Sequence, residues 1–154
     1  MTAQPLLFLD DFSPGQTFAS SAVTVDADAI KAYAQQFDPQ PFHLDEAAAA
    51  STLFKGLAAS GWHTVSMTMR LLVDGGLPIA GGIIGAGVDE IRWPRPTRPD
   101  DTLRLVTEVL EVRPSKSRPD QGLMKVRTTT FNQNDEPVQV MVSNLVVMRR
   151  PERV

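Results

Sequence analysis

A carboxylate and an imidazole lie close together in the stretch Asp38-Pro39-Gln40-Pro41-Phe42-His43. Proton transfer near neutral pH needs one group that accepts and one that donates, and imidazole titrates closest to that range. The two prolines lower the entropy of holding the pair in place. Asp38 and His43 are therefore a candidate acid/base pair. An aspartate that only ends a helix, and a histidine that only bonds a backbone carbonyl, fit the same spacing.

Gly61 lies in the longest apolar segment of the chain, within a predicted helix. The first turn of a helix has unpaired amides and the positive end of the dipole, which suit a developing oxyanion. A glycine there lets a ligand carbonyl approach the backbone. Close packing against a sheet explains the glycine equally well, so both roles remain open.

Ser60 has three possible roles: helix cap, hydrogen-bond donor to a ligand, or nucleophile. Capping is the default, and no nucleophile-elbow pattern surrounds it. His63, in the same segment, is expected to be a packed histidine rather than a catalyst. Arg92, Arg95 and Arg98 alternate with prolines and either meet phosphates of a large ligand or are solvated.

Composition excludes several classes of protein. The 154 residues are 42% hydrophobic and 21% charged, which indicates one globular domain over residues 1–154. A net charge of -3 without a basic stripe disfavours a nucleic-acid partner. Without cysteine, and with two histidines outside any carboxylate cluster, no disulfide or metal site is expected. The N-terminal residues predict no signal peptide or membrane span, so we expect a cytoplasmic protein.

The elements that would position these side chains follow from the hydrophobic period. A helix is predicted over 27–37 with Asp26 as its cap, then an extended loop over 38–43 and a short helix over 45–51 capped by Asp45. Residues 57–73 are apolar nearly all round, which predicts a buried central helix that ends at Asp74-Gly75-Gly76.

Strand signals surround these helices. A first strand is predicted over 16–25, and four more over 83–93, 102–112, 122–132 and 137–149. Leu103, Leu105, Thr107 and Val109 form one alternating row, and Val138, Val140 and Val142 form another. Short connections favour an antiparallel sheet whose apolar face covers the long helix. The fold class is therefore α+β.

Three blocks of the sequence resemble the MaoC-like dehydratase family, which contains the (R)-specific enoyl-CoA hydratases. They are Phe37-Asp38-Pro39-Gln40-Pro41-Phe42-His43-Leu44-Asp45, Ala58-Ala59-Ser60-Gly61-Trp62, and Arg92-Trp93-Pro94-Arg95-Pro96 with Asp101-Thr102-Leu103. The resemblance runs from about Asp11 to Arg149 and implies the hot-dog fold, an antiparallel sheet around one long helix. Many hydratases of the family have a histidine where this chain has Ser60.

The resemblance implies an acyl-CoA hydratase/dehydratase. Asp38 and His43 would hold and activate water, and the Gly61 amide would bind the thioester oxygen of a 2-enoyl-CoA. Ser60, Trp62, Phe42 and Arg95 would contact the substrate, with Trp62 adding bulk near the acyl group. A coenzyme A thioester would be the substrate, and no metal or redox cofactor is expected.

Other functions remain open, because hot-dog domains also serve as thioesterases and as non-catalytic acyl-CoA-binding subunits. The presence of both titratable residues argues against a binding-only role. We also expect a homodimer or a dimer of dimers, because a sheet of this kind leaves long edges and faces that need covering.

Overall fold

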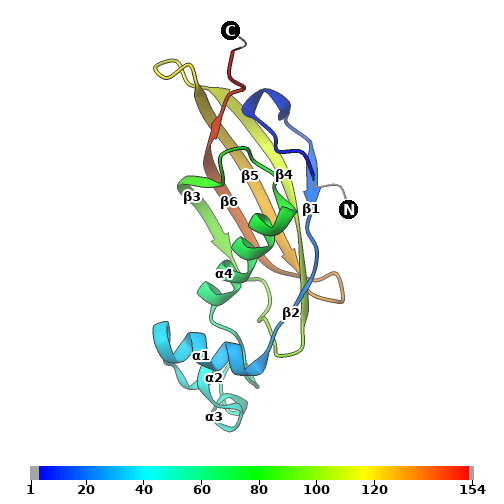
Figure 1. The fold of residues 1–154 in the computed structure, drawn as a ribbon. Coiled ribbons are helices and arrows are strands. Elements are labelled where there is room, and N and C mark those ends of the chain that lie inside the picture. The colour runs from blue at the N-terminus through cyan, green and yellow to red at the C-terminus, as the bar shows by residue number, and fades with distance from the viewer. Residues whose placement is uncertain (1–3, 153–154) are drawn as a thin grey trace.

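An antiparallel sheet curves around a single helix in the computed structural model, which describes residues 4–152 (Figure 1). The sheet has the strand order β1-β4-β5-β6-β3, and β2 pairs with β4 beside this path. The strands are β1 (Thr17–Ala19), β2 (Val23–Thr24), β3 (Ile84–Arg92), β4 (Thr102–Pro114), β5 (Gln121–Phe131) and β6 (Pro137–Met148). This arrangement confirms the α+β fold class.

The central helix, α4 (Gly61–Leu71), starts later than predicted. Residues 57–60 are buried but not helical, because backbone groups in this segment bond to other loops. The amide of Ala58 donates to the carbonyl of Phe42 at 3.1 Å, and that of Ala59 to Thr97 at 2.9 Å. At its other end α4 continues into a π-helical turn, Leu72–Gly76, where Gly75 adopts a φ of 127°. That left-handed conformation favours glycine and ends the helix as expected.

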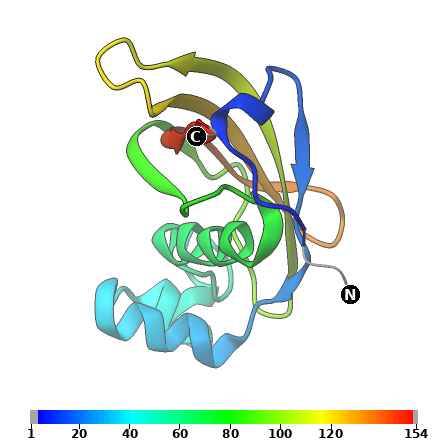
Figure 2. The same cartoon turned by 45° about the horizontal axis from the view of Figure 1, so that its top comes forward.

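Three more helices gather at the end of the molecule where α4 begins (Figure 2). They are α1 (Ala27–Phe37), α2 (Pro41–Leu44) and α3 (Glu46–Ala50), and a 3-10 turn, Leu9–Asp11, precedes the first strand. The predicted caps are confirmed: Asp26 accepts from Ala29 N at 3.3 Å and Asp45 from Ala47 N at 2.9 Å. The extended loop predicted over 38–43 is wrong in its second half, because Pro41 occupies the first position of α2. Its fixed φ suits that position.

The predicted first strand is divided into β1 and β2. The backbone of Ser20 still pairs with Leu105 O at 3.0 Å, but its hydroxyl accepts from Leu105 N at 2.9 Å. The Ser20 side chain thereby replaces a backbone acceptor in the sheet, and the strand is interrupted between β1 and β2. In β4 the predicted row of inward residues is confirmed, since Leu103, Leu105, Thr107 and Val109 are fully buried.

The inward face of β6 is the opposite of the predicted one over most of the strand. Gln139, Met141, Ser143, Leu145 and Val147 are buried, whereas Val140 and Val142 are only partly buried. Val138 is buried, and a register irregularity between β5 and β6 lies at Thr130/Phe131. Hydrogen bonds to buried side chains compensate for placing the polar Gln139 inside, which hydropathy alone does not anticipate.

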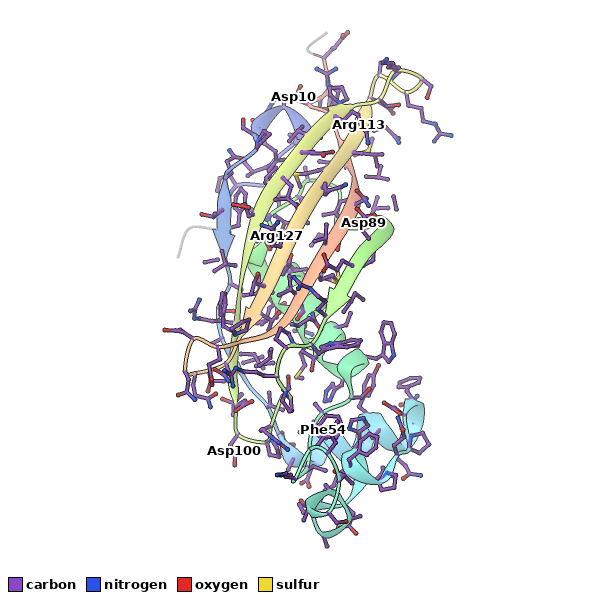
Figure 3. The ribbon with its side chains drawn as sticks, turned by 180° about the vertical axis from the view of Figure 1, so that it is seen from behind. Asp10, Phe54, Asp89, Asp100, Arg113 and Arg127 are labelled. Carbon is purple, nitrogen blue, oxygen red and sulfur yellow. The ribbon has the colours of Figure 1, made fainter. Side chains whose placement is uncertain are left out.

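The outer face of the sheet carries charge. Arg127 pairs with Glu108 at 3.2 Å, and Lys125 pairs with Asp89 at 3.1 Å (Figure 3).

The helix α4 is not buried all round, contrary to the prediction. Trp62 is 57% exposed and Met69 38%, and Val73 in the following turn is 62% exposed. The edge strand β3 is exposed along nearly its whole length, and among the strands of residues 4–152 it pairs only with β6. One side of α4 and the adjoining β3 therefore form a continuous uncovered surface.

Candidate active site

A cleft of about 580 Å³ opens where α4 begins, between the short helices and the segment after β3. All seven residues predicted for the site line it: Asp38, His43, Gly61, Ser60, Trp62, Phe42 and Arg95. Phe54, another lining residue, lies at the end of the molecule opposite Arg113 and Asp10 (Figure 3). Trp62 is 57% exposed, so much of this residue faces solvent. The structure thus brings together residues from three separate blocks of sequence, and their functional roles remain predictions.

Asp38 and His43 face each other. Asp38 ends α1, and its amide donates to Ala34 O at 2.8 Å, which fixes the position of the residue. His43 lies on α2 and is 4% exposed. The Asp38 Oδ2 atom is 3.3 Å from His43 Nε2. The short helix that replaces the expected loop is what turns His43 toward the carboxylate.

The other ring nitrogen of His43 fixes the tautomer. His43 Nδ1 lies 2.6 Å from the carbonyl oxygen of Ala58. A carbonyl can only accept, so Nδ1 carries a hydrogen. Nε2 is thereby the ring nitrogen that faces the Asp38 carboxylate in the cleft. The histidine does bond a backbone carbonyl, and that bond orients its free nitrogen.

The carboxylate of Asp38 is held in its charged form. Burial alone would raise its pKa, but hydrogen bonding from Gln40 and Ser60 and the attraction of His43 outweigh it, so the pKa lies below the usual value of 3.8. Gln40 Nε2 donates to Asp38 Oδ1 at 2.5 Å. Gln40, between the two prolines, is a site residue that the sequence analysis did not identify.

Ser60 is the N-cap residue of α4, but its hydroxyl does not cap the helix. The residue is fully buried, and its Oγ makes no hydrogen bond of standard geometry within residues 4–152. It nevertheless lies close enough to the Asp38 carboxylate to help lower its pKa. Because a buried hydroxyl without a partner is costly, its unused donor beside Asp38 favours a role in the site over capping.

Gly61 serves close packing, one of its two proposed roles. A Cβ at this position would lie 2.6 Å from Cε2 of Trp93, so only glycine lets the indole approach the helix. The amides of Gly61 and Trp62 have no hydrogen-bond partner in the described part of the chain. They remain available to a ligand, as the first amides of a helix are. Packing and amide donation are therefore compatible.

Trp93 was not predicted as a site residue, although it stands in the Arg92–Pro96 block. It lines the cleft, and its Nε1 donates to Gln139 Oε1 at 3.0 Å. The only sequence signal for Gln139 is a polar residue within an apolar strand.

The three arginines have different environments. Arg95 lines the cleft and pairs with Glu136 at 3.0 Å. Arg92 pairs with Glu90 at 2.6 Å. Arg98 donates to the carbonyls of Gly56 at 2.9 Å and Leu57 at 3.2 Å, and also to that of Phe54. Arg98 therefore holds the loop that leads into α4.

His63 lies outside the cleft lining, as expected for a packed histidine. It is 8% exposed and stacks on Tyr33 of α1 with ring centroids 4.6 Å apart. Burial lowers its pKa. Its Nδ1 is buried without a hydrogen-bond partner among residues 4–152.

No group of three or more potential metal-ligating side chains gathers anywhere in the described ranges. The helices of this same part of the chain are too short or too polar to cross a membrane.

Comparison with known proteins places this geometry in a family. The family model described as MaoC like domain matches residues 11–132 of this chain. The uncharacterised protein YdeM of Bacillus subtilis (strain 168) is 33% identical over 140 residues, which cover 91% of this chain and 96% of that protein.

Solved structures of MaoC-like proteins and hydratases are also similar to this chain. The MaoC-like dehydratase from Rhodospirillum rubrum is 57% identical, with a TM-score of 0.92 over 95% of this chain and 99% of that one. The R-hydratase PhaJ1 from Pseudomonas aeruginosa is 25% identical, with a TM-score of 0.71 over 96% of this chain and 91% of that one. These similarities confirm the hot-dog fold. The chain therefore belongs to the MaoC-like family.

Proposed function

We propose that the cleft binds a 2-enoyl-CoA and adds water across its double bond, or removes water from the 3-hydroxyacyl thioester. One observation carries this proposal: the Asp38–His43 pair and the unpaired amides at the start of α4 line the same cleft. Membership of a family that includes dehydratases, and similarity to an (R)-hydratase, support this reaction class.

The amide of Gly61 would donate a hydrogen bond to the thioester oxygen of the substrate. Polarising that carbonyl makes C3 electrophilic and stabilises the enolate that forms when water attacks. The dipole of α4, a helix of 11 residues, adds to this stabilisation. The reaction moves a proton and a hydroxyl group without changing the oxidation state of a cofactor, so its chemistry requires no redox partner.

The acid/base pair would carry the proton between water and C2. A water molecule that contacts both Asp38 and His43 from the cleft loses its proton to Nε2 of His43, while its oxygen bonds to C3. The resulting imidazolium is stabilised by the charged carboxylate 3.3 Å away. The pair then returns a proton to C2, which collapses the enolate and restores the carbonyl. Dehydration follows the same path in reverse.

Replacing Asp38 with Asn tests the proposal. Crotonyl-CoA hydration, followed by loss of enoyl absorbance, should fall by roughly 100- to 10,000-fold, the usual contribution of an acid/base group. Asp28→Asn, the same change at an exposed position of α1, is the matched control and should retain activity. Undiminished turnover in Asp38→Asn would refute the assignment. Release of free CoA thiol in place of hydration would indicate a thioesterase.

We also propose that the protein forms a homodimer through the uncovered surface of α4 and β3. Met69 on the helix and Ile84 and Val88 on the strand are 38%, 48% and 52% exposed. An open edge strand beside exposed apolar side chains is unusual in a monomer. Light scattering should give at least twice the chain mass of 16.8 kDa, and a monomer mass would refute this.

A further inference from the structure

We infer that Trp93, anchored by Gln139, forms an inner wall of the cleft that restricts the enzyme to short-chain acyl groups of about crotonyl size. This inference rests on the proposed function, because it assumes an acyl thioester bound at the Gly61 amide. It identifies two specificity-determining residues and narrows the class of substrate.

The indole of Trp93 occupies the space directly beside Gly61. The contact is so close that a single Cβ on Gly61 would overlap three ring atoms, at 2.6, 2.7 and 3.0 Å. A thioester whose oxygen binds the Gly61 amide therefore has its acyl carbons next to this ring. Trp93 is 43% exposed, so the rest of this residue also faces solvent.

A chain of buried polar side chains fixes the indole in place. Trp93 Nε1 donates to Gln139 Oε1 at 3.0 Å, and Gln139 Nε2 donates to Thr68 Oγ1 at 3.0 Å. Thr68 in turn bonds Thr130 at 2.8 Å. Gln139, Thr68 and Thr130 are fully buried. Moving the ring away would leave buried polar groups without partners, which is costly, so the ring stays in position.

The polar chain divides the space between α4 and the sheet. On one side is the cleft, which Gly61 and Thr64 of α4 line. On the other is an apolar groove of about 490 Å³, lined by Val65 and Met69 of α4 and by Met141 of β6. Thr68 lies on α4 between these two sets, and Gln139 is two residues before Met141 on the same face of β6. An acyl chain extending along α4 would meet the polar chain before it reached the groove.

Binding of unreactive saturated thioesters tests the wall independently of catalysis. Butyryl-CoA and octanoyl-CoA are titrated calorimetrically into wild type and Trp93→Ala. Wild type should gain no affinity from the four extra methylene groups, whereas each buried methylene normally improves affinity about fourfold. Trp93→Ala should shift the octanoyl-to-butyryl affinity ratio toward octanoyl by on the order of tenfold or more, as two or more methylenes become buried.

Two further variants control for the loss of an aromatic ring. Phe37→Ala removes an aromatic ring that is 65% exposed and lies outside the cleft lining. It should leave the chain-length ratio unchanged. Trp93→Phe keeps a ring beside Gly61 and should retain the preference for butyryl-CoA. Thermal melts by circular dichroism confirm that each variant is folded, and Trp93→Leu replaces any Ala variant that is not.

The outcomes separate the two hypotheses. The inference that Trp93 limits chain length would be refuted if wild type bound octanoyl-CoA at least tenfold more tightly than butyryl-CoA. An unchanged octanoyl-to-butyryl affinity ratio in folded Trp93→Ala or Trp93→Leu would refute it as well. Either result leaves the proposed hydratase function intact. Failure of wild type to bind either thioester would instead overturn the proposed function, and the chain-length inference with it.

Discussion

A buried histidine lies on each side of the first turn of α4: His43 of α2 on one side and His63 of α4 on the other. Their chemical environments differ. On the cleft side, His43 Nδ1 bonds the Ala58 carbonyl at 2.6 Å, and its Nε2 lies 3.3 Å from the Asp38 carboxylate. On the side facing α1, His63 stacks on Tyr33, and its Nδ1 has no partner within residues 4–152.

This difference shows what distinguishes a candidate catalytic histidine from a packed one. Burial does not separate them, since His43 is 4% and His63 8% exposed. The distinction lies in the groups around the ring: a carbonyl sets the tautomer of His43, and a charged carboxylate can stabilise its imidazolium. His63 has aromatic contact instead, and burial disfavours its charged form.

The largest expected effect is the difference in activity between two matched substitutions. His43→Gln should lower kcat/KM for crotonyl-CoA by roughly 100- to 10,000-fold, because it removes the proton acceptor. His63→Gln should reduce it far less, because that ring lies outside the cleft lining. Steady-state kinetics on both variants measure the contrast, and equal losses would contradict it.

Gly61→Ala should have the next largest effect, a loss of stability. The substitution lies where the cleft meets α4. The new methyl group overlaps the Trp93 ring, which cannot move without losing its bond to Gln139. Overpacking of this kind costs about 1–3 kcal/mol in the free energy of unfolding, measured in urea. The same substitution in a Trp93→Ala background should cost much less. Equal costs in the two backgrounds would exclude the contact as the cause.

Ser60→Ala should have a smaller effect on the cleft, because it shifts the pH dependence of activity without removing an acid/base group. Removing the hydroxyl takes away one of the groups that lower the pKa of Asp38, so that pKa should rise. The activity that requires the carboxylate would then be lost at a higher pH on the acid side of the kcat/KM profile. Ser60→Thr, which keeps a hydroxyl, should restore the profile. An unchanged acid limb in Ser60→Ala would show that the hydroxyl does not act on Asp38.

The smallest expected effect concerns stability on the α1 side. The pKa of His63 is lower in the folded protein than its ordinary value of 6.5, so the unfolded chain binds more protons as pH falls below that value. The contribution of His63 to stability is therefore complete above pH 6.5 and decreases with falling pH, by at most about 1.4 kcal/mol per pH unit. Urea unfolding across this range should show a shallower slope for His63→Gln. An identical slope would mean that His63 is not held neutral.

Much of the fold could be predicted from local signals. The α1 helix has the predicted bounds, because Asp26 caps its start and Pro39 limits its end. The inward row of β4 follows the predicted alternation. The seven predicted site residues do meet in one cleft, although the sequence predicted Asp38 and His43 in one loop and Gly61 inside a longer helix.

Other features depend on contacts between distant residues. Residues 57–60 have the composition of a helix, but their amides bond to Phe42 and Thr97, and so the helix begins later. Hydropathy assigns Gln139 to the outer face of β6, whereas bonds to Trp93 and Thr68 hold it inside. Neither partner is near Gln139 in sequence.

The sequence by itself determined the chemical groups of this protein and most of its elements, because caps, prolines and hydrophobic alternation act over a few residues. Only the tertiary structure decided which nitrogen of His43 faces Asp38, why residue 61 must lack a side chain, and which wall closes the cleft. Those features depend on hydrogen bonds and steric contacts between residues far apart in the chain, and a local pattern does not encode them.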